Sequence, residues 1–200
     1  MPKQRITREM VIDTAFELAR SGGMEQVLVK NIAGKLGCSV QPIYSYLDNM
    51  ENLRKEVEIR AGQFIREAVS AALVPDDIFR STGRAWLDIA RREPHLFRLF
   101  VFQERQDIAS FADLYQAESG PGMAGTIAGE LGISLEQAKE LHLNMLIYTI
   151  GMGTIFSVAN PGIPAQEIFA RQEKAYQAFL QYAEQGTDAG CKQKEMQKEP

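Results

Sequence analysis

The chain has 200 residues, of which 45% are hydrophobic and 24% are charged, and its formal net charge is −4. This length allows one large or two small domains, and the composition is typical of a soluble globular protein with a sizeable core. The widely separated Cys38 and Cys191 argue against a structural disulfide, and no signal-peptide core or apolar run of membrane-spanning length is apparent, so a cytoplasmic protein without a membrane partner is expected.

The negative charge is not spread evenly along the chain. Up to Leu47 there are six Lys or Arg residues and four Asp or Glu residues, a net charge of +2. Because the whole chain has a net charge of −4, the remaining residues carry a net charge of −6. A weakly basic N-terminal part is compatible with nucleic-acid binding. Because +2 is a modest charge, phosphate contacts would come partly from amides and hydroxyls.

A short arm with Lys3 and Arg5 precedes the first predicted helix, which begins after Thr7 as its N-cap and runs to about Arg20. Apolar residues of this helix recur on one stripe and beside it: Val11, Ile12, Ala15, Phe16, Leu18 and Ala19. Residues 21–23, Ser-Gly-Gly, end the helix.

Residues 28–47 predict two short helices joined by a tight turn. The first has apolar residues at helical spacing: Val29, Ile32, Ala33 and Leu36. Gly37 ends it, because glycine can enter the left-handed conformation that a sharp exit requires. Ser39 lies at the N-cap position of the second helix, and Pro42 falls in its first turn, where a missing N–H costs little. Ile43 and Leu47 would face inward.

The second short helix presents amides, hydroxyls and phenols with almost no charge, which suits the floor of a DNA major groove. Gln41 and Ser45 are the first candidates for contacts to base edges. Contacts to phosphates are predicted for five residues: Thr7, Lys30, Ser39, Tyr44 and Tyr46. Two short helices with a glycine turn also occur in helical hairpins that contact no nucleic acid, so that alternative stays open.

With the helix before it and residues 48–53 after it, this stretch resembles the N-terminal DNA-binding domain of TetR-type transcriptional repressors. The resemblance lies in four features: the Ile32-Ala33 pair, the turn at residues 36–39, the Ile43-Tyr44 pair, and Leu53 opening a longer helix. It covers about the first quarter of the chain. Two positions depart from the family pattern: Leu28 replaces a capping threonine, at a cost of about 1 kcal/mol, and Met50 replaces a lysine near a phosphate.

The resemblance implies an all-α fold in which an N-terminal three-helix helix-turn-helix domain, residues 1–48, precedes a helical ligand-binding and dimerisation domain, residues 49–185. The polar residues 186–200 are expected to form a disordered tail. Beyond residue 48 all strong signals are helical, with helices predicted over 49–73, 78–93, 95–102, 108–118, 123–131, 135–159 and 165–185. Ser134 and Gln137 have the spacing of a capping box.

The last two long helices are so apolar that each is expected to be either central in the core or buried by a second subunit. In the family that the chain resembles, they form a four-helix dimer interface, and Gly151 and Gly153 would permit close helix approach. Dimerisation also suits DNA geometry, because two recognition helices must reach successive major grooves ~34–36 Å apart.

A second, mostly apolar set could line a ligand pocket, which the resemblance favours: Trp86, Phe97, Phe100, Met123, Asn144, Met145, Tyr148 and Met152. Asn144, Tyr148 or His142 would be its polar handles. For each residue alone, a packed core with methionines as gap fillers is the simpler account, and both interpretations stay open.

An enzyme is the main competing class. No Gly-rich phosphate loop, metal-ligand spacing or nucleophile motif appears, so no catalytic residue, metal ion or cofactor is predicted. The sequence instead predicts a ligand-responsive transcriptional regulator, a repressor by resemblance, that binds a palindromic double-stranded DNA operator as a homodimer and is released by a small, largely apolar effector. The alternative is a helical protein-interaction module without DNA binding.

Overall fold

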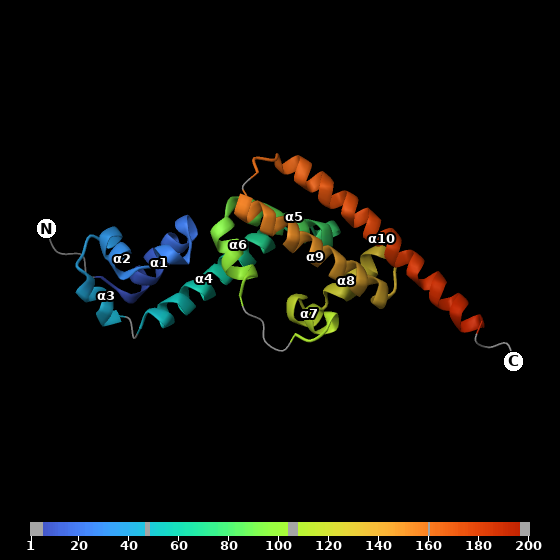
Figure 1. Ribbon diagram of the computed structural model, residues 1–200, viewed down its shortest axis with the longest axis horizontal. Coiled ribbons are helices and arrows are strands. Elements are labelled where there is room, and N and C mark those ends of the chain that lie inside the picture. Colours follow the sequence, from blue (N-terminus) through green and yellow to red (C-terminus); the bar gives the residue numbers. More distant parts are fainter. Residues whose placement is uncertain (1–5, 47–48, 104–107, 160, 197–200) are drawn as a thin grey trace. The chain divides into compact units, whose positions relative to one another are not determined.

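The computed structural model describes residues 6–46, 49–103, 108–159 and 161–196, with side chains through Gln185. Throughout these ranges the regular elements are helices and no strand occurs, which confirms the expected all-α fold (Figure 1). The α-helices are α1 (Arg8–Gly22), α2 (Val29–Leu36), α3 (Val40–Tyr46), α4 (Met50–Ala71), α5 (Ile78–Arg92), α6 (Pro94–Val101), α7 (Phe111–Glu118), α8 (Met123–Leu131), α9 (Leu135–Ala159) and α10 (Ala165–Met196). Two 3-10 turns, η1 (Met24–Gln26) and η2 (Pro75–Asp77), precede α2 and α5.

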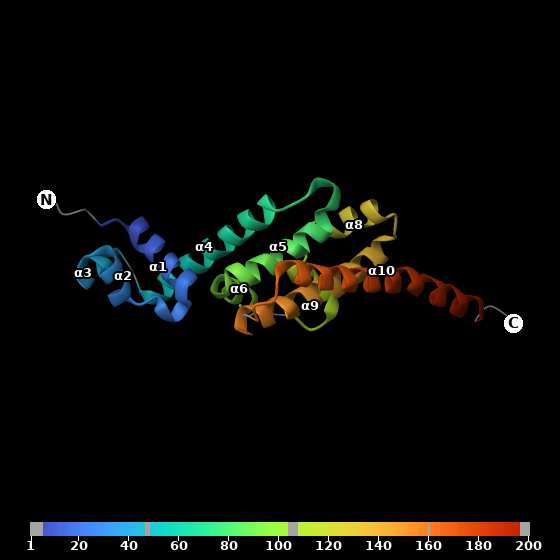
Figure 2. The same cartoon turned by 90° about the horizontal axis from the view of Figure 1, so that it is seen from above.

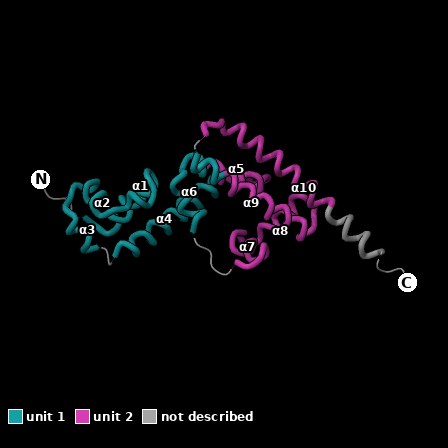
Figure 3. The backbone as a smooth tube through the Cα atoms, viewed as in Figure 1, with its two compact units in different colours: residues 1–71, 89–103, 153–160 teal, residues 72–88, 104–152, 161–200 magenta. Residues whose placement is uncertain are grey.

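The chain forms two compact units, each assembled from three separate stretches (Figure 3). Unit 1 contains residues 1–71, 89–103 and 153–160, and unit 2 contains residues 72–88, 104–152 and 161–200. This division differs from the boundary expected after residue 48. The reason is that Leu53 and Val57 of α4 are buried in the same core as Val11 of α1, and Leu99 of α6 packs against that core.

The core of unit 1 is built on the apolar stripe predicted for α1. All six residues of that stripe are buried, and α1 contacts α2, α3, α4 and α6, so it is the central helix of this unit (Figure 2). The Thr7 hydroxyl oxygen accepts a hydrogen bond from the Met10 amide at 3.2 Å, which confirms the predicted N-cap. Gly23, at φ 88°, follows the last helical residue, so α1 ends two residues later than predicted.

Unit 2 has its own core, which joins α5, α8, α9 and α10. The buried residues of this core are Phe79, Ile127, Ala138, Leu141, Met145, Tyr176 and Ala183. The predicted capping box at the start of α9 is present, because the Ser134 amide donates to Gln137 Oε1 at 2.8 Å and the Gln137 amide donates to Ser134 Oγ at 3.2 Å. α8 has the bounds that the sequence predicted.

α10 is longer than expected. It was predicted to end near Gln185 before a disordered tail, but the backbone is helical to Met196. Gly186 and Gly190 each weaken a helix by about 1 kcal/mol relative to alanine, which does not by itself end one. The expected tail is therefore helical over residues 186–196, and residues 197–200 lie outside the described ranges.

α9 corrects another expectation, namely that no apolar run reaches the length of a membrane span. It has 25 residues and a mean hydropathy of 1.4 over its most apolar stretch, so among the described residues one helix is long and apolar enough to cross a membrane. Only 33% of that stretch is buried within the chain. The core helix of a globular protein meets the same criteria of length and composition.

Candidate nucleic-acid interface

The two short helices α2 and α3 are joined by a turn with the predicted left-handed glycine. Gly37, at φ 64° and ψ 32°, follows the last residue of α2. Its amide donates to the Gly34 carbonyl at 3.3 Å, and the Cys38 amide donates to the Ala33 carbonyl at 3.0 Å. These bonds satisfy carbonyls that the end of α2 would otherwise leave unpaired, and they fix the exit direction of the chain into α3.

The inward faces of α2 and α3 pack against the core of unit 1. Ile32 and Ile43 are completely buried, Ala33 is buried, and Cys38 packs against the same core from the turn. The predicted inward residue Leu47 lies outside the described residues. Leu28, which precedes α2, makes no side-chain capping hydrogen bond, as its departure from the family pattern implied. Burial of both isoleucines holds the opposite face of α3 in a fixed orientation.

The outward face of α3 carries Gln41, Tyr44 and Ser45, which are three and four residues apart and therefore share one side of the helix. All three are exposed, and Tyr44 is 61% exposed. No residue of α3 is charged. Ser45 Oγ donates to the Pro42 carbonyl at 2.7 Å, so its remaining capacity is to accept hydrogen bonds. The Gln41 amide can both donate and accept.

Val40 is a surface residue of this face that sequence reasoning missed. It opens α3 and is 44% exposed, next to Gln41. A valine at the first position of a helix with no core partner is the signal that could have identified it. An exposed methyl pair at this position can contact the methyl group of thymine.

The residues predicted for phosphate contacts have different surroundings. Thr7, Lys30, Ser39 and Tyr44 are exposed, and within the described part of the chain Lys30 forms no ion pair. Tyr46 is half-buried, and its hydroxyl donates to the Ile6 carbonyl at 2.8 Å. That donor already has a partner, so Tyr46 anchors the segment before α1 and is a weaker candidate for a phosphate. Lys3 and Arg5 lie outside the described residues.

Two other cations of unit 1, Arg8 and Arg60, are paired with carboxylates. Arg8 pairs with Glu56 at 2.7 Å, and Arg60 pairs with Glu9 at 2.9 Å and with Asp13. In α2, Lys30 and Lys35 are both exposed. A low charge density of this kind favours contacts from hydroxyls and amides.

The residues predicted for a ligand pocket are divided between the two units. Phe97 and Phe100 belong to unit 1, and the other six belong to unit 2: Trp86, Met123, Asn144, Met145, Tyr148 and Met152. Met123 packs against the core that contains Met145. Asn144 donates to Glu140 Oε1 at 3.1 Å on an exposed surface, and the Tyr148 hydroxyl lies 3.5 Å from the Arg171 carbonyl.

The two glycines of α9 have different environments. Gly153 is buried, and a Cβ placed on it would overlap the ring of Phe97, which is itself 1% exposed. Close approach at Gly153 is therefore made by α6 of the same chain. Gly151 is exposed, and a Cβ placed on it would meet nothing within 4 Å. Of these two glycines, therefore, only Gly151 could allow the close approach of a helix from a second chain that the sequence predicted.

Among the expected polar handles, His142 has the most enclosed position. Its Nδ1 lies 3.0 Å from the Tyr115 hydroxyl, and its ring meets the rings of Phe79 and Tyr115 edge-on, with centroids 5.5 and 5.3 Å apart. Burial lowers the pKa of His142 from 6.5 to about 4, so the imidazole is neutral at pH 7. It can then exchange one hydrogen bond with Tyr115 without carrying charge.

Comparison with known proteins gives no match from which a function could be inferred, so a functional proposal depends on the residues described above. No protein-family model matches the chain, and no curated protein matches it at a significant level. Among the described residues, no three His, Cys, Asp or Glu side chains are grouped so as to hold a metal ion.

Proposed function

We propose that the chain is a ligand-responsive transcriptional regulator of the TetR type that binds a palindromic DNA operator as a homodimer and is released by a small, largely apolar effector. The resemblance favours repression of transcription over activation. The observation that carries the proposal is the geometry of α3, whose exposed face of Gln41, Tyr44 and Ser45 is uncharged and polar while Ile43 beneath it is completely buried. In this proposal α2, the turn and α3 form a helix-turn-helix.

Base readout would come from the first turns of α3. The Gln41 amide suits a bidentate contact to adenine N6 and N7, and the Ser45 hydroxyl oxygen can accept from a base amino group. Val40 would contact a thymine methyl. Phosphates would be contacted by Lys30 and Tyr44, and by Thr7 and Ser39 near the N-termini of α1 and α3.

Dimerisation is supported by an apolar stripe on α9 that this chain leaves exposed. Ile147, Ile155 and Val158 are 45%, 60% and 68% exposed, and Gly151 lies on the same stripe at helical spacing. Three large aliphatic side chains in water are unfavourable unless another surface covers them. A second copy of α9 is the partner that a two-fold operator requires, and Gly151 would let the two helices approach closely.

Effector release requires that a ligand bind one arrangement of the dimer more tightly than the other. Contacts in unit 1 support a route by which α9 influences the helices nearest DNA. Arg98 of α6 donates to the Ser157 carbonyl of α9, and Glu93, which precedes α6, pairs with Arg20 of α1. A shift of α9 would therefore act on α1 through α6.

The proposal is tested by fluorescence anisotropy and electrophoretic shifts with DNA that flanks the gene's own coding region, across a salt series. We expect specific binding that weakens as salt rises, because counterions are released from phosphates. Tyr44→Ala should abolish the specific shift. Phe111→Ala, which removes a 68% exposed aromatic ring of unit 2, is the matched control and should bind as the wild type does.

If wild-type protein that is folded and dimeric binds neither this DNA nor any sequence in a selection from random duplexes, the proposal is wrong. The helical protein-interaction module is then the better account. If Phe111→Ala loses binding as fully as Tyr44→Ala, the assignment of α3 as the reading helix is wrong.

A further inference from the structure

Gln172 is a buried polar side chain whose position the proposed DNA-binding function does not explain. It lies on the buried stripe of α10 between Ile168 and Tyr176, one turn to either side, and it is only 4% exposed. Its Nε2 has no hydrogen-bond partner among the described residues. Buried amide donors are nearly always paired, because an unpaired donor loses its bonds to water without replacement.

The surroundings of Gln172 bring together three helices of unit 2. A Cβ placed on Gly83 of α5 would overlap Gln172 Nε2 and would lie 3.9 Å from Thr149 Oγ1 of α9. Thr149 is 8% exposed and follows Met145 by one turn on the buried stripe of α9. An amide and a hydroxyl therefore converge where α5 has no side chain, in the middle of stripes that are otherwise apolar.

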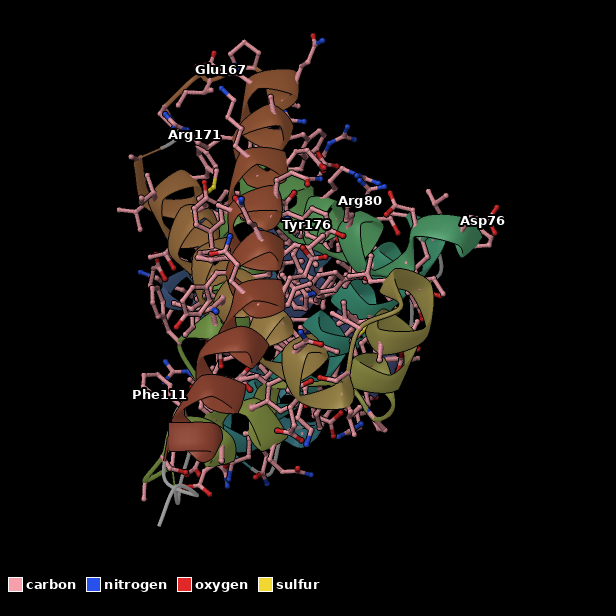
Figure 4. The ribbon with its side chains drawn as sticks, turned by 90° about the vertical axis from the view of Figure 1, so that its right-hand side faces the viewer. Asp76, Arg80, Phe111, Glu167, Arg171 and Tyr176 are labelled. Atoms are coloured by element: carbon pink, nitrogen blue, oxygen red, sulfur yellow. The ribbon has the colours of Figure 1, made fainter. Side chains whose placement is uncertain are left out.

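Two arginines of α5 on either side of Gly83 in sequence, Arg80 and Arg84, are already paired with carboxylates. Arg80 pairs with Asp77 at 2.7 Å and with Glu173 at 3.2 Å, its guanidinium lies over the Tyr176 ring at 5.4 Å (Figure 4), and Arg84 pairs with Asp77 at 2.6 Å. Within the described residues, neither arginine is left to balance the negative charge of a bound carboxylate. The donor set of Gln172 and Thr149 therefore fits a neutral oxygen acceptor better than an anion.

We propose that Gln172 and Thr149, facing Gly83, form the polar end of the effector site and donate hydrogen bonds to a neutral carbonyl oxygen, as in a ketone, ester or amide, of an otherwise apolar effector. This inference rests on the proposed function, in which an effector binds the helical part of the chain. It gives a role to a glutamine at a position where leucine would fill a similar volume without an unpaired donor. Gly83 is required because any side chain there would displace the amide.

The first test needs no ligand. Replacing an unpaired buried amide by an apolar group of similar size removes the penalty, so Gln172→Leu should raise the midpoint of thermal unfolding by a few degrees, about 2–4 °C. Gln181→Leu, the same change at an exposed position of α10, is the control and should leave the midpoint nearly unchanged. A clear fall in the midpoint for Gln172→Leu would show that the amide has a structural partner, and the inference would be wrong.

The second test uses a panel of methyl ketones and primary amides with six to twelve carbons, with the matching alcohols as controls, titrated by calorimetry into the full-length protein. We expect at least one carbonyl compound to bind more tightly than its alcohol, and Gln172→Leu to weaken it at least tenfold while Gln181→Leu leaves it unchanged. Equal binding by wild type and Gln172→Leu, or no binding by any carbonyl compound, would overturn the inference.

Operator binding is measured on the same samples, so that the two proposals fail separately. Specific DNA binding with no Gln172-dependent carbonyl binding leaves the regulator standing and removes this site. Gln172-dependent carbonyl binding without any specific DNA binding keeps the site and removes the regulator.

Discussion

Arg20 of α1 and Glu93, the residue before α6, form a bidentate ion pair, with Nε to Oε2 at 2.9 Å and Nη2 to Oε1 at 2.6 Å. The hydrogen bonds that Arg20 donates to Glu93 raise the pKa of Arg20 above its ordinary value, against the opposing effect of burial. The same guanidinium lies 4.8 Å from the centre of the Phe64 ring of α4. One side chain thus joins three helices of unit 1, two of which, α1 and α6, are separated by 71 residues or more in sequence.

The pair should contribute measurable stability because Glu93 is only 17% exposed at its side chain. A double-mutant cycle with Arg20→Met and Glu93→Gln should give a coupling free energy of about 1 kcal/mol by urea unfolding at a fixed protein concentration. The exposed pair Glu51 and Lys55, at 2.9 Å, is the control and should show no measurable coupling. Additive effects for Arg20 and Glu93 would mean that the pair contributes nothing.

Gly34, inside α2, and Gly37, in the turn that follows α2, should respond oppositely to replacement by alanine. Gly37→Ala should destabilise the protein by about 1 kcal/mol, because φ is 64° there and alanine is strained in that region. Gly34→Ala lies inside α2, is exposed, and meets nothing within 4 Å, so it should stabilise by about 1 kcal/mol. Thermal unfolding of both variants checks this, and a shared sign would contradict it.

DNA contacts of different kinds should respond differently to sequence and salt. Gln41→Ala should weaken binding to the specific operator by about 1–3 kcal/mol while leaving nonspecific binding almost unchanged, because it removes a proposed base contact. Lys30→Ala should weaken binding to all sequences alike and reduce the salt slope by about one. Anisotropy titrations on operator and scrambled duplexes separate the two, and identical behaviour of both variants would refute these roles.

His142 should make stability depend on pH between about 4 and 6.5. Its pKa is lowered by burial to about 4 in the folded chain, so in this window the unfolded chain binds the proton and the folded chain does not. Its contribution is fully present above pH 6.5 and is lost as pH falls towards 4, on the order of 3 kcal/mol in all. His142→Gln should flatten the unfolding free energy over this window relative to wild type. An unchanged pH profile in His142→Gln would show that His142 is not the group responsible.

The exposed stripe of α9 predicts the oligomeric state. Ile155→Glu should convert a dimer to a monomer in sedimentation experiments, because a carboxylate would be buried against its symmetry mate. Ile59→Glu of α4 changes an isoleucine of similar exposure, 57% against 60%, and should leave the dimer intact. Dimers that persist in Ile155→Glu would place the contact elsewhere.

Local sequence signals predicted much of this fold correctly. The stripe of α1, the capping box at Ser134 and the left-handed Gly37 were all recognisable because each depends on residues within a few positions of one another. The expected DNA-contact roles of Gln41, Lys30 and their neighbours stay predictions, since no comparison or bound DNA tests them.

Features that depend on contacts between distant segments could not be predicted. The Tyr46 hydroxyl bonds the Ile6 carbonyl 40 residues away, which changes its expected role. Gly153 is covered by Phe97 of the same chain, and the amide of Gln172 is buried beside Gly83, 89 positions earlier in the numbering. Periodicity identifies which face of a helix is buried, but it does not identify the side chain that will lie opposite.

The discontinuous composition of unit 1 bears on how this chain could be recombined with others. A chimera that joins residues 1–48 to a foreign effector domain would cut between α1 and α4, whose Val11 and Val57 share one core, and would discard Leu99 of α6. Residues 1–48 in such a chimera would expose the aliphatic side chains of this core to water, and they would unfold or aggregate. A chimera that also includes α4 and α6 would keep that core complete. The part of the chain that can be transferred as a folded unit is therefore a set of helices that are not contiguous in sequence.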